Sequence, residues 1–147
     1  MAAPEQPFLH EGLDDLSSEI RWRLTHRDGS SQLSLAGELD LAGVAELDRA
    51  AAGLHVNGGG ETVVVDLARA SFVDSSVIAW LLRLSRRVEA GGCDFVVLVE
   101  GGAVRSTLEI SGVCNLLTVF EQNGAGRRSR VGPPGPRPDL TGPRWSE

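Results

Sequence analysis

Two short runs of apolar residues, separated by a long stretch with helical spacing, constrain the fold of this 147-residue chain more than any other feature. The runs are TVVVDL at 62–67 and DFVVLV at 94–99, and each has the length and composition of a buried strand. Between them, four apolar residues recur at the spacing of one helical face: Val77, Leu81, Leu84 and Val88. This unit predicts a sheet packed with helices, and the continuous apolar character of the first run predicts helices on both of its faces.

The rest of the chain continues the alternation of strands and helices. EIRWRLTH at 19–26 and QLSLAG at 32–37 alternate apolar and polar side chains around an RDGSS turn, which predicts a β-hairpin. The helical pattern at 38–54 places five apolar residues on roughly one face: Leu41, Val44, Ala45, Leu47 and Leu54. A short helix at 103–112 and a strand at 116–121 follow. We therefore predict an α/β fold, a mixed β-sheet in the order β-β-α-β-α-β-α-β packed with α-helices.

Composition divides the chain into three parts. Residues 1–18 carry four acidic residues and no basic one, whereas residues 122–147 are rich in Gly, Pro and Arg. Neither segment holds enough apolar side chains to offset the entropy of ordering. We therefore expect a single domain at 19–121, with a flexible N-terminal tail at 1–18 and a disordered C-terminal tail at 122–147.

Charge and hydropathy argue against several classes of function. The formal net charge is −6 and no basic stripe is present, which argues against a nucleic-acid surface. The chain begins without the pattern of a signal peptide and has no run near the roughly 18 apolar residues of a membrane span, so we expect a cytoplasmic protein. The histidines are scattered, and Cys93 and Cys114 match no metal motif, so no metal or cofactor is expected.

Asp74, Ser75 and Ser76 stand together at the start of the strongest predicted helix, beyond the end of a strand. Helix capping explains one of them, because Asp and Ser are preferred at the N-cap. The first turn of a helix also favours an anion, through its free N–H groups and the helix dipole. A phosphate on one of the serines would leave the fold intact and add nearly two negative charges to an acidic surface. The position therefore predicts a phosphorylation switch.

Four segments, taken together in their order and spacing, resemble the STAS domain, and specifically bacterial anti-sigma factor antagonists, also called anti-anti-sigma factors. They are LAGELD at 35–40, VVVDLARASFVDSS at 63–76, GG with FVVLV at 91–99, and AVRSTLEISGV at 103–113. The resemblance covers about residues 19–121. It implies a regulatory binding module without enzymatic activity, in which the unphosphorylated antagonist binds an anti-sigma factor and frees the sigma factor for transcription. The implied partner is a serine kinase of the histidine-kinase-like ATPase type, and phosphorylation by it ends the binding.

Carried over by position, the resemblance places the phosphoacceptor on Ser76, with Ser75 as the alternative. It implies a partner-binding surface formed by Asp40, Asp74, Ser75, Ser76 and Val77, with the Asp40 loop next to the same helix start. A phosphate beside Asp40 and Asp74 would bring like charges together and repel the partner. The family usually has glycine where this chain has Val77, so this side chain either narrows the space beside the serine or belongs to the core face of the helix.

Other interpretations remain open. A STAS docking subunit of a membrane phospholipid ABC transport complex would use the same fold without phosphorylation. A hydrolase with Ser76 as nucleophile would need a partnered histidine, which the sequence does not supply. Exposed arginines of the predicted long helix form either a solvated face or part of a docking surface: Arg83, Arg86 and Arg87. A redox disulfide between Cys93 and Cys114 is a further hypothesis, and we expect the free protein to be a monomer.

Overall fold

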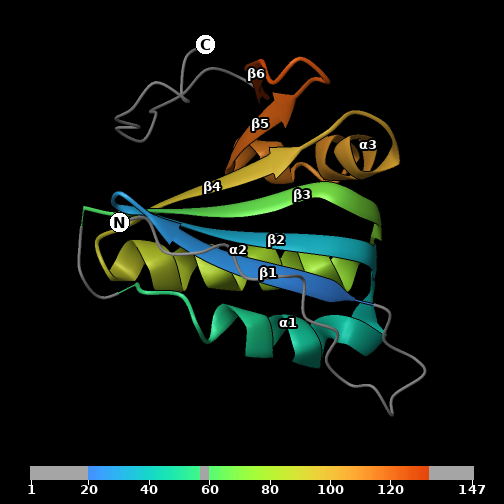
Figure 1. The fold of residues 1–147 in the computed structure, drawn as a ribbon. Coiled ribbons are helices and arrows are strands. Elements are labelled where there is room, and N and C mark those ends of the chain that lie inside the picture. The colour runs from blue at the N-terminus through green and yellow to red at the C-terminus, as the bar shows by residue number, and fades with distance from the viewer. Residues whose placement is uncertain (1–19, 57–59, 133–147) are drawn as a thin grey trace.

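A six-stranded mixed sheet and three α-helices form the domain in the computed structural model, which describes residues 20–56 and 60–132 (Figure 1). The elements are β1 (Arg21–Arg27), β2 (Ser30–Leu39), the 3-10 helix η1 (Leu41–Gly43), α1 (Val44–Ala51), β3 (Thr62–Val73), α2 (Ser75–Ala90), β4 (Asp94–Val99), α3 (Ala103–Ile110), the 3-10 helix η2 (Val113–Asn115), β5 (Thr118–Gln122) and β6 (Arg128–Val131). The predicted α/β class and the predicted order β-β-α-β-α-β-α-β are confirmed from β1 to β5.

The first two strands form the predicted β-hairpin. β1 and β2 pair antiparallel, and Arg27 faces Ser30 across a two-residue loop. Asp28 and Gly29 occupy that loop with φ angles of 43° and 78°. Positive φ at both central residues is the geometry of a type I′ turn, which the Asp-Gly pair favours because glycine has no Cβ to clash.

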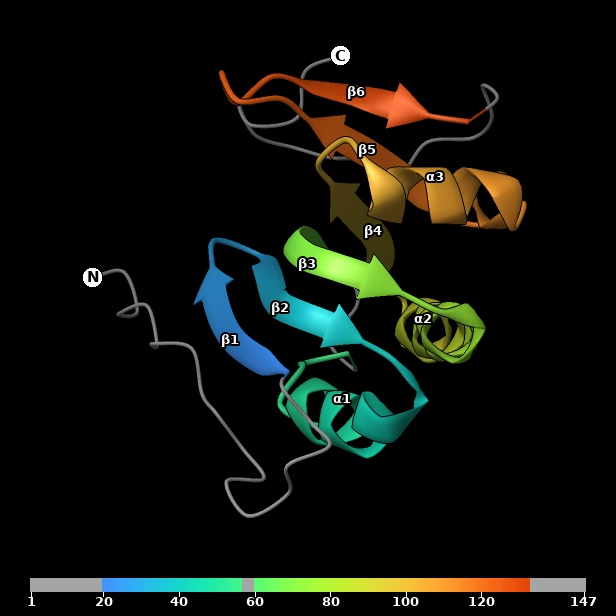
Figure 2. The same cartoon turned by 90° about the vertical axis from the view of Figure 1, so that its right-hand side faces the viewer.

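All three α-helices lie on one face of the sheet, because of the strand order. The strands follow one another as β1-β2-β3-β4-β5-β6, and β2 to β5 are parallel. Each crossover between parallel neighbours therefore moves one strand along in the same direction, and right-handed crossovers then place every connecting helix on the same side. Figure 2 shows α1, α2 and α3 together on that side. The expectation of helices on both faces of β3 is wrong.

Both faces of the central strands are nevertheless buried, which explains their continuous apolar runs. Val63, Val65 and Leu67 of β3 belong to the main core cluster beneath the helices. A second, smaller cluster consists of Val64, Val96, Leu98 and Phe120, which alternate with the core residues of β3, β4 and β5. Because successive side chains of a strand point to opposite faces, this cluster lies on the outer face of the sheet, away from the helices.

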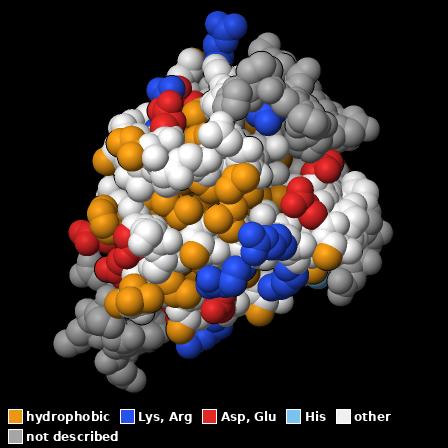
Figure 3. Space-filling model, turned by 180° about the vertical axis from the view of Figure 1, so that it is seen from behind, with side chains coloured by type: hydrophobic (Ala, Val, Ile, Leu, Met, Phe, Trp, Pro, Cys, Tyr) orange, Lys and Arg blue, Asp and Glu red, His pale blue; other side chains and the backbone are white. Residues whose placement is uncertain are grey.

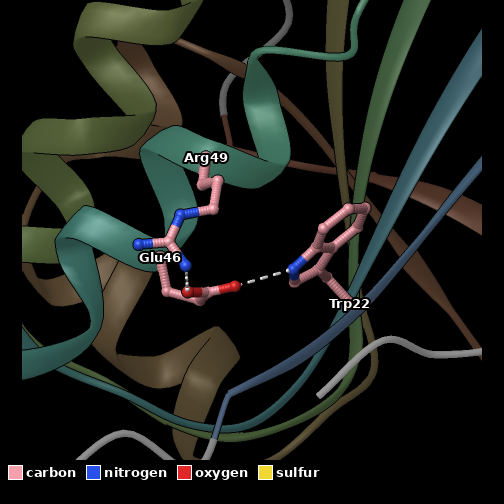
Figure 4. Close-up of polar contacts among 3 residues, drawn as sticks. All are labelled: Trp22, Glu46 and Arg49. Atoms are coloured by element: carbon pink, nitrogen blue, oxygen red, sulfur yellow. Dashed lines mark hydrogen bonds and ion pairs between the residues drawn. The ribbon is translucent and has the colours of Figure 1, made fainter. Parts of the chain in front are cut away.

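A buried polar contact ties β1 to α1 on the helix side (Figure 4). The indole Nε1–H of Trp22 donates a hydrogen bond to Oε2 of Glu46 at 3.0 Å. The other carboxylate oxygen, Oε1, accepts from Nη1 of Arg49 at 2.9 Å. The buried carboxylate of Glu46 is thus held by one donor from each element, and this holds α1 against the edge of the sheet.

The C-terminal boundary predicted at residue 122 needs correction. β6 pairs antiparallel with β5, and Val131 is buried in the main core beside Val119. The side chain of Asn123 accepts from the backbone N–H groups of Ala125 and Arg127, at 2.9 Å each, and so builds the turn between the two strands. The Gly- and Arg-rich composition of this stretch concealed a hairpin. The remaining parts of the predicted tails, residues 1–18 and 133–147, lie outside the described residues.

Candidate functional site at the start of helix α2

The ends of two parallel strands bring Asp40 and Asp74 together. In the register of β2 and β3, Leu39 pairs with Val73, so the next residue of each strand end is an aspartate. The backbone N–H of Leu41 donates to Oδ2 of Asp74 at 3.1 Å, across the gap between the strand ends. This contact confirms the prediction that the Asp40 loop lies next to the start of α2.

Asp74 is the N-cap of α2. It has the extended backbone conformation of an N-cap residue, and its Oδ1 accepts from the backbone N–H groups of Ser76 at 3.0 Å and Val77 at 3.1 Å. Since Oδ2 accepts from Leu41, one carboxylate both caps the helix and fastens η1 to it. The capping interpretation of Asp74 is confirmed.

The hydrogen bonds of Asp74 favour its charged form. Desolvation acts to raise the pKa of this carboxyl group, but four hydrogen bonds act against it, from the Ser76 hydroxyl and from the backbone of Val77, Leu41 and Ser76. Together they outweigh desolvation and hold the pKa of Asp74 below its ordinary value. A fixed negative charge therefore stands at the start of α2 at neutral pH.

The two serines differ in their surroundings. Ser75 is exposed, whereas Ser76 is half-buried and its Oγ donates a hydrogen bond to Oδ1 of Asp74 at 2.5 Å. The Ser76 oxygen is thereby fixed in position at the surface, as a nucleophile or phosphoacceptor requires. The described histidines, His26 and His55, stack on each other with ring centroids 4.5 Å apart. His26 lies by the β1–β2 turn, where β2 begins, so this pair is at the other end of the sheet from Ser76.

Val77 does not belong to the exposed surface. Its side chain is 0% exposed and lies in the main core cluster. Its backbone N–H, rather than its side chain, takes part in the site by donating to Asp74. The place of Val77 in the predicted partner-binding set is corrected accordingly: the departure from the usual glycine is accommodated in the core.

Two exposed apolar residues flank the aspartates, and sequence reasoning did not assign them to the site. Leu41, expected on the buried helix face, begins η1 instead and is 71% exposed. Phe72 near the end of β3 is 47% exposed. The alternation of β3 contained a signal for Phe72, because its neighbour Val73 points into the core. Both side chains are thus accessible to a partner that binds at the start of α2.

Beyond its first turn, α2 presents basic side chains to solvent. Arg83, Arg86 and Arg87 are exposed, and Nη2 of Arg87 also donates to the backbone oxygen of Ala51 at 3.2 Å. Figure 3 views the molecule from the side on which α2 lies and shows basic side chains gathered beside hydrophobic ones. Arg87 thus also contributes to packing, because it joins α2 to the end of α1.

The described residues were also compared with the requirements of metal sites, membrane spans and disulfides. No group of three or more His, Cys, Asp and Glu side chains in residues 20–56 and 60–132 is placed to hold a metal ion. None of the helices described there has the length and apolar character needed to span a membrane. Cys93 and Cys114 are both buried free thiols, and burial, with a smaller contribution from Glu109, raises the pKa of Cys114. The hypothetical disulfide between them is not formed in this structure.

Comparisons with known proteins agree with this architecture. A protein-family model described as "Mlab, STAS domain" matches residues 22–118. The crystal structure of an anti-sigma factor antagonist from Mycobacterium paratuberculosis is similar with a TM-score of 0.62 and 23% identity, over 69% of this chain and 85% of that chain. The structure of the anti-sigma factor antagonist SpoIIAA in its unphosphorylated form is similar with a TM-score of 0.51 and 25% identity, over 67% and 86% of the respective chains. No curated protein matches the sequence.

Proposed function

The chain belongs to the STAS domain family, and on this premise we propose that it is an anti-sigma factor antagonist switched by phosphorylation of Ser76. Its unphosphorylated form binds an anti-sigma factor, itself a serine kinase of the histidine-kinase-like ATPase type, and thereby releases the sigma factor. The similarity to SpoIIAA supports the general role. The protein acts in the cytoplasm, is a monomer when free, and has no enzymatic activity of its own.

The observation that carries the proposal is the position of the Ser76 hydroxyl, which is held by Asp74 in the first turn of α2 next to the Asp40 loop. A kinase partner that binds around this point meets a fixed hydroxyl group. The exposed side chains of Leu41 and Phe72 supply the apolar contacts that a protein interface needs at its centre.

Phosphorylation would change this surface in two ways. The hydroxyl hydrogen that now reaches Asp74 would be replaced by a phosphoryl group with nearly two negative charges. Two like charges about 5 Å apart repel each other by about 3 kcal/mol at the effective dielectric constant of a protein surface. The phosphate must therefore turn away from Asp74 and outward, into the space that the partner occupies. If the outward phosphate costs the complex about 3 kcal/mol of binding free energy, the affinity falls roughly a hundredfold.

The helix itself would survive the modification. The backbone N–H groups of Ser76 and Val77 bond to Asp74 rather than to either serine hydroxyl, so the cap stays in place when Ser76 is phosphorylated. The switch then acts on binding and leaves the fold unchanged.

A second candidate is a STAS docking subunit of a membrane phospholipid ABC transport complex. The exposed side chains of Leu41 and Phe72 would supply a docking surface for it that needs no phosphate. In that case the same surface would bind a transport ATPase, and Ser76 would serve only the local hydrogen bonding around Asp74.

The test is intact-mass analysis after incubation with ATP and kinase-type anti-sigma factors from the same genome. We expect a mass gain of one phosphate in the native chain and in Ser75→Ala, and none in Ser76→Ala. A phosphate that persists in Ser76→Ala would contradict the assignment of the acceptor. No phosphate with any of these kinases, together with binding to a transport ATPase, would favour the second candidate.

A further inference from the structure

The connection that follows α1 packs closely against β1. Leu54 and Val56 are buried in the main core cluster, whereas His55 between them is exposed. A Cβ added to Gly53 would lie 2.8 Å from Cδ2 of Leu24 in β1, so this contact has no spare room. Residues 53–56, here called the α1–β3 connection, are therefore held against the sheet by their apolar side chains, with one histidine left at the surface.

That histidine stacks on a histidine of β1. The ring centroids of His55 and His26 are 4.5 Å apart and the ring planes differ by 16°, which is the geometry of an aromatic stack. The half-buried ring of His26 is itself fixed, because its Nδ1 and Oγ of Ser31 form a hydrogen bond at 2.8 Å. Ser31 is buried and faces His26 from β2. One ring is thus anchored to the sheet, and the other belongs to the α1–β3 connection.

The charges around the stack make it sensitive to pH, because imidazole takes up a proton near pH 6.5. Two titratable groups act on His26 from neighbouring segments: His55, and Glu61 directly before β3. Burial lowers the pKa of His26, the charge of His55 acts in the same direction, and Glu61 acts against both. The fold therefore favours the neutral ring of His26, and two positive rings at 4.5 Å would repel each other.

We propose that the His26–His55 stack is a pH-sensitive clasp, which holds the α1–β3 connection on β1 while the rings are neutral and releases it when they are protonated. Since the folded state favours neutral His26, the clasp contributes its full stability above about pH 6.5 and loses it as the pH falls through the lower pKa of the folded state. Asp74 keeps its charge until the pH falls below about 4, so the two effects occur in separate ranges.

Nuclear magnetic resonance of the protein alone tests the clasp. The measurement needs neither a kinase nor ATP, so its outcome is independent of the proposed function. At about pH 7.5 we expect nuclear Overhauser effects between the rings of His26 and His55, and at about pH 5.5 we expect these to be lost. The amide hydrogen of Leu54, which donates to the backbone oxygen of Ala51, should exchange at least about tenfold faster at the lower pH, after correction for intrinsic exchange. Val97 in β4 should not change in this way.

His55→Phe is the matched variant, because phenylalanine keeps a ring that can stack and removes one of the two charges. Both chains carry His10→Gln, so that the only other histidine of the sequence does not titrate. Urea unfolding measures the equilibrium constant for unfolding at each pH. Between about pH 7.5 and 5.5, this constant should rise at least about threefold more in the chain with the clasp than in His55→Phe.

Three results would overturn the proposal. The first is ring contacts that are absent at pH 7.5 or persist at pH 5.5. The second is an equal pH dependence of the two chains, since the charge of His55 would then have no effect. The third is faster exchange at Val97 to the same extent as at Leu54, which would show a loss of global stability in place of a local release. If His55→Phe does not fold, the resonance measurements on the native chain decide.

Discussion

Replacement of Asp74 by alanine should destabilise the domain through the loss of one carboxylate that joins three parts of the fold. Oδ1 accepts from the backbone N–H groups of Ser76 and Val77, and Oδ2 accepts from Leu41. Alanine removes the helix cap and the link to η1 at once. Asparagine keeps an oxygen for the cap and removes only the charge.

The expected magnitudes follow from these contacts. Loss of an aspartate N-cap costs about 1 kcal/mol, with a range of about 0.5–2 kcal/mol. The hydrogen bond from Leu41 contributes about 0.5–1 kcal/mol, since its donor is partly exposed and water can replace the carboxylate. Asp74→Ala should therefore lower the free energy of unfolding by about 1.5–2 kcal/mol, or the Tm by roughly 6–9 °C for a domain of this size. Asp74→Asn should cost about 0.5 kcal/mol, because asparagine caps helices nearly as well.

The pH dependence has a definite sign. The pKa of Asp74 is lower in the folded state than in the unfolded chain, so its contribution to stability is fully present above the unfolded pKa, about 3.9. The contribution is lost as the pH falls through the lower pKa of the folded state. The stability difference between the native chain and Asp74→Asn should therefore be constant above about pH 5 and shrink below about pH 4.

Urea unfolding followed by circular dichroism measures these differences, with Asp48→Ala, an exposed acidic residue of α1, as the control. The control should change the free energy of unfolding by less than about 0.5 kcal/mol. An Asp74→Ala variant as stable as the control would refute the capping role. An Asp74→Asn variant as unstable as Asp74→Ala would show that charge, and not the capping oxygen, carries the effect.

Three further predictions concern packing and binding. Gly91→Ala should destabilise the domain by about 3 kcal/mol or more in thermal unfolding, because the new Cβ would lie 1.5 Å from the backbone oxygen of Val56. Gly124→Ala is the control: its Cβ would meet open space, so the free energy of unfolding should change by less than about 0.5 kcal/mol. Glu46→Ala should lower the free energy of unfolding in urea by about 1–3 kcal/mol, because the buried indole N–H of Trp22 would lose its acceptor. A decrease of less than about 0.5 kcal/mol would argue against that contact. Leu41→Ser should weaken binding to the anti-sigma factor at least tenfold in calorimetric titration with unchanged Tm. The control Ile110→Ser, at the end of α3, changes a side chain that is even more exposed and should leave binding unchanged.

The central unit of the fold was predictable because its signals are local and strong. The apolar runs at 62–67 and 94–99 and the helical pattern between them correspond to β3, β4 and α2. The Asp28–Gly29 pair likewise fixes the first hairpin. In each case the residues that give the pattern also make the contacts that stabilise the element.

Features that depend on distant residues were not predictable in the same way. β6 has only four residues, and its one core residue, Val131, is buried through its pairing with β5 rather than through any local pattern. The placement of all helices on one face follows from the strand order, which apolar runs do not reveal. Leu41 fits a helical face in sequence, but η1 turns the chain before α1 begins and leaves it in solvent.

The candidate site was predictable in its chemistry and only partly in its surface. The Asp74, Ser75 and Ser76 motif indicates a helix start, and the structure gives it the expected cap. Its proximity to Asp40 depends on the parallel pairing of β2 with β3. The helical pattern favoured the core for Val77, and the alternation of β3 contained a signal for Phe72, but the exposure of Leu41 beside Asp40 required the three-dimensional structure.

The affinity of one kinase-type anti-sigma factor for this protein, measured by calorimetric titration before and after stoichiometric phosphorylation, tests the central claim most directly. We predict that phosphate on Ser76 weakens binding of the native chain about a hundredfold. The Ser76→Ala variant should bind like the unphosphorylated native chain, and ATP should not weaken the binding of this variant. Equal affinities of the phosphorylated and unphosphorylated forms would contradict the claim that Ser76 is the switch.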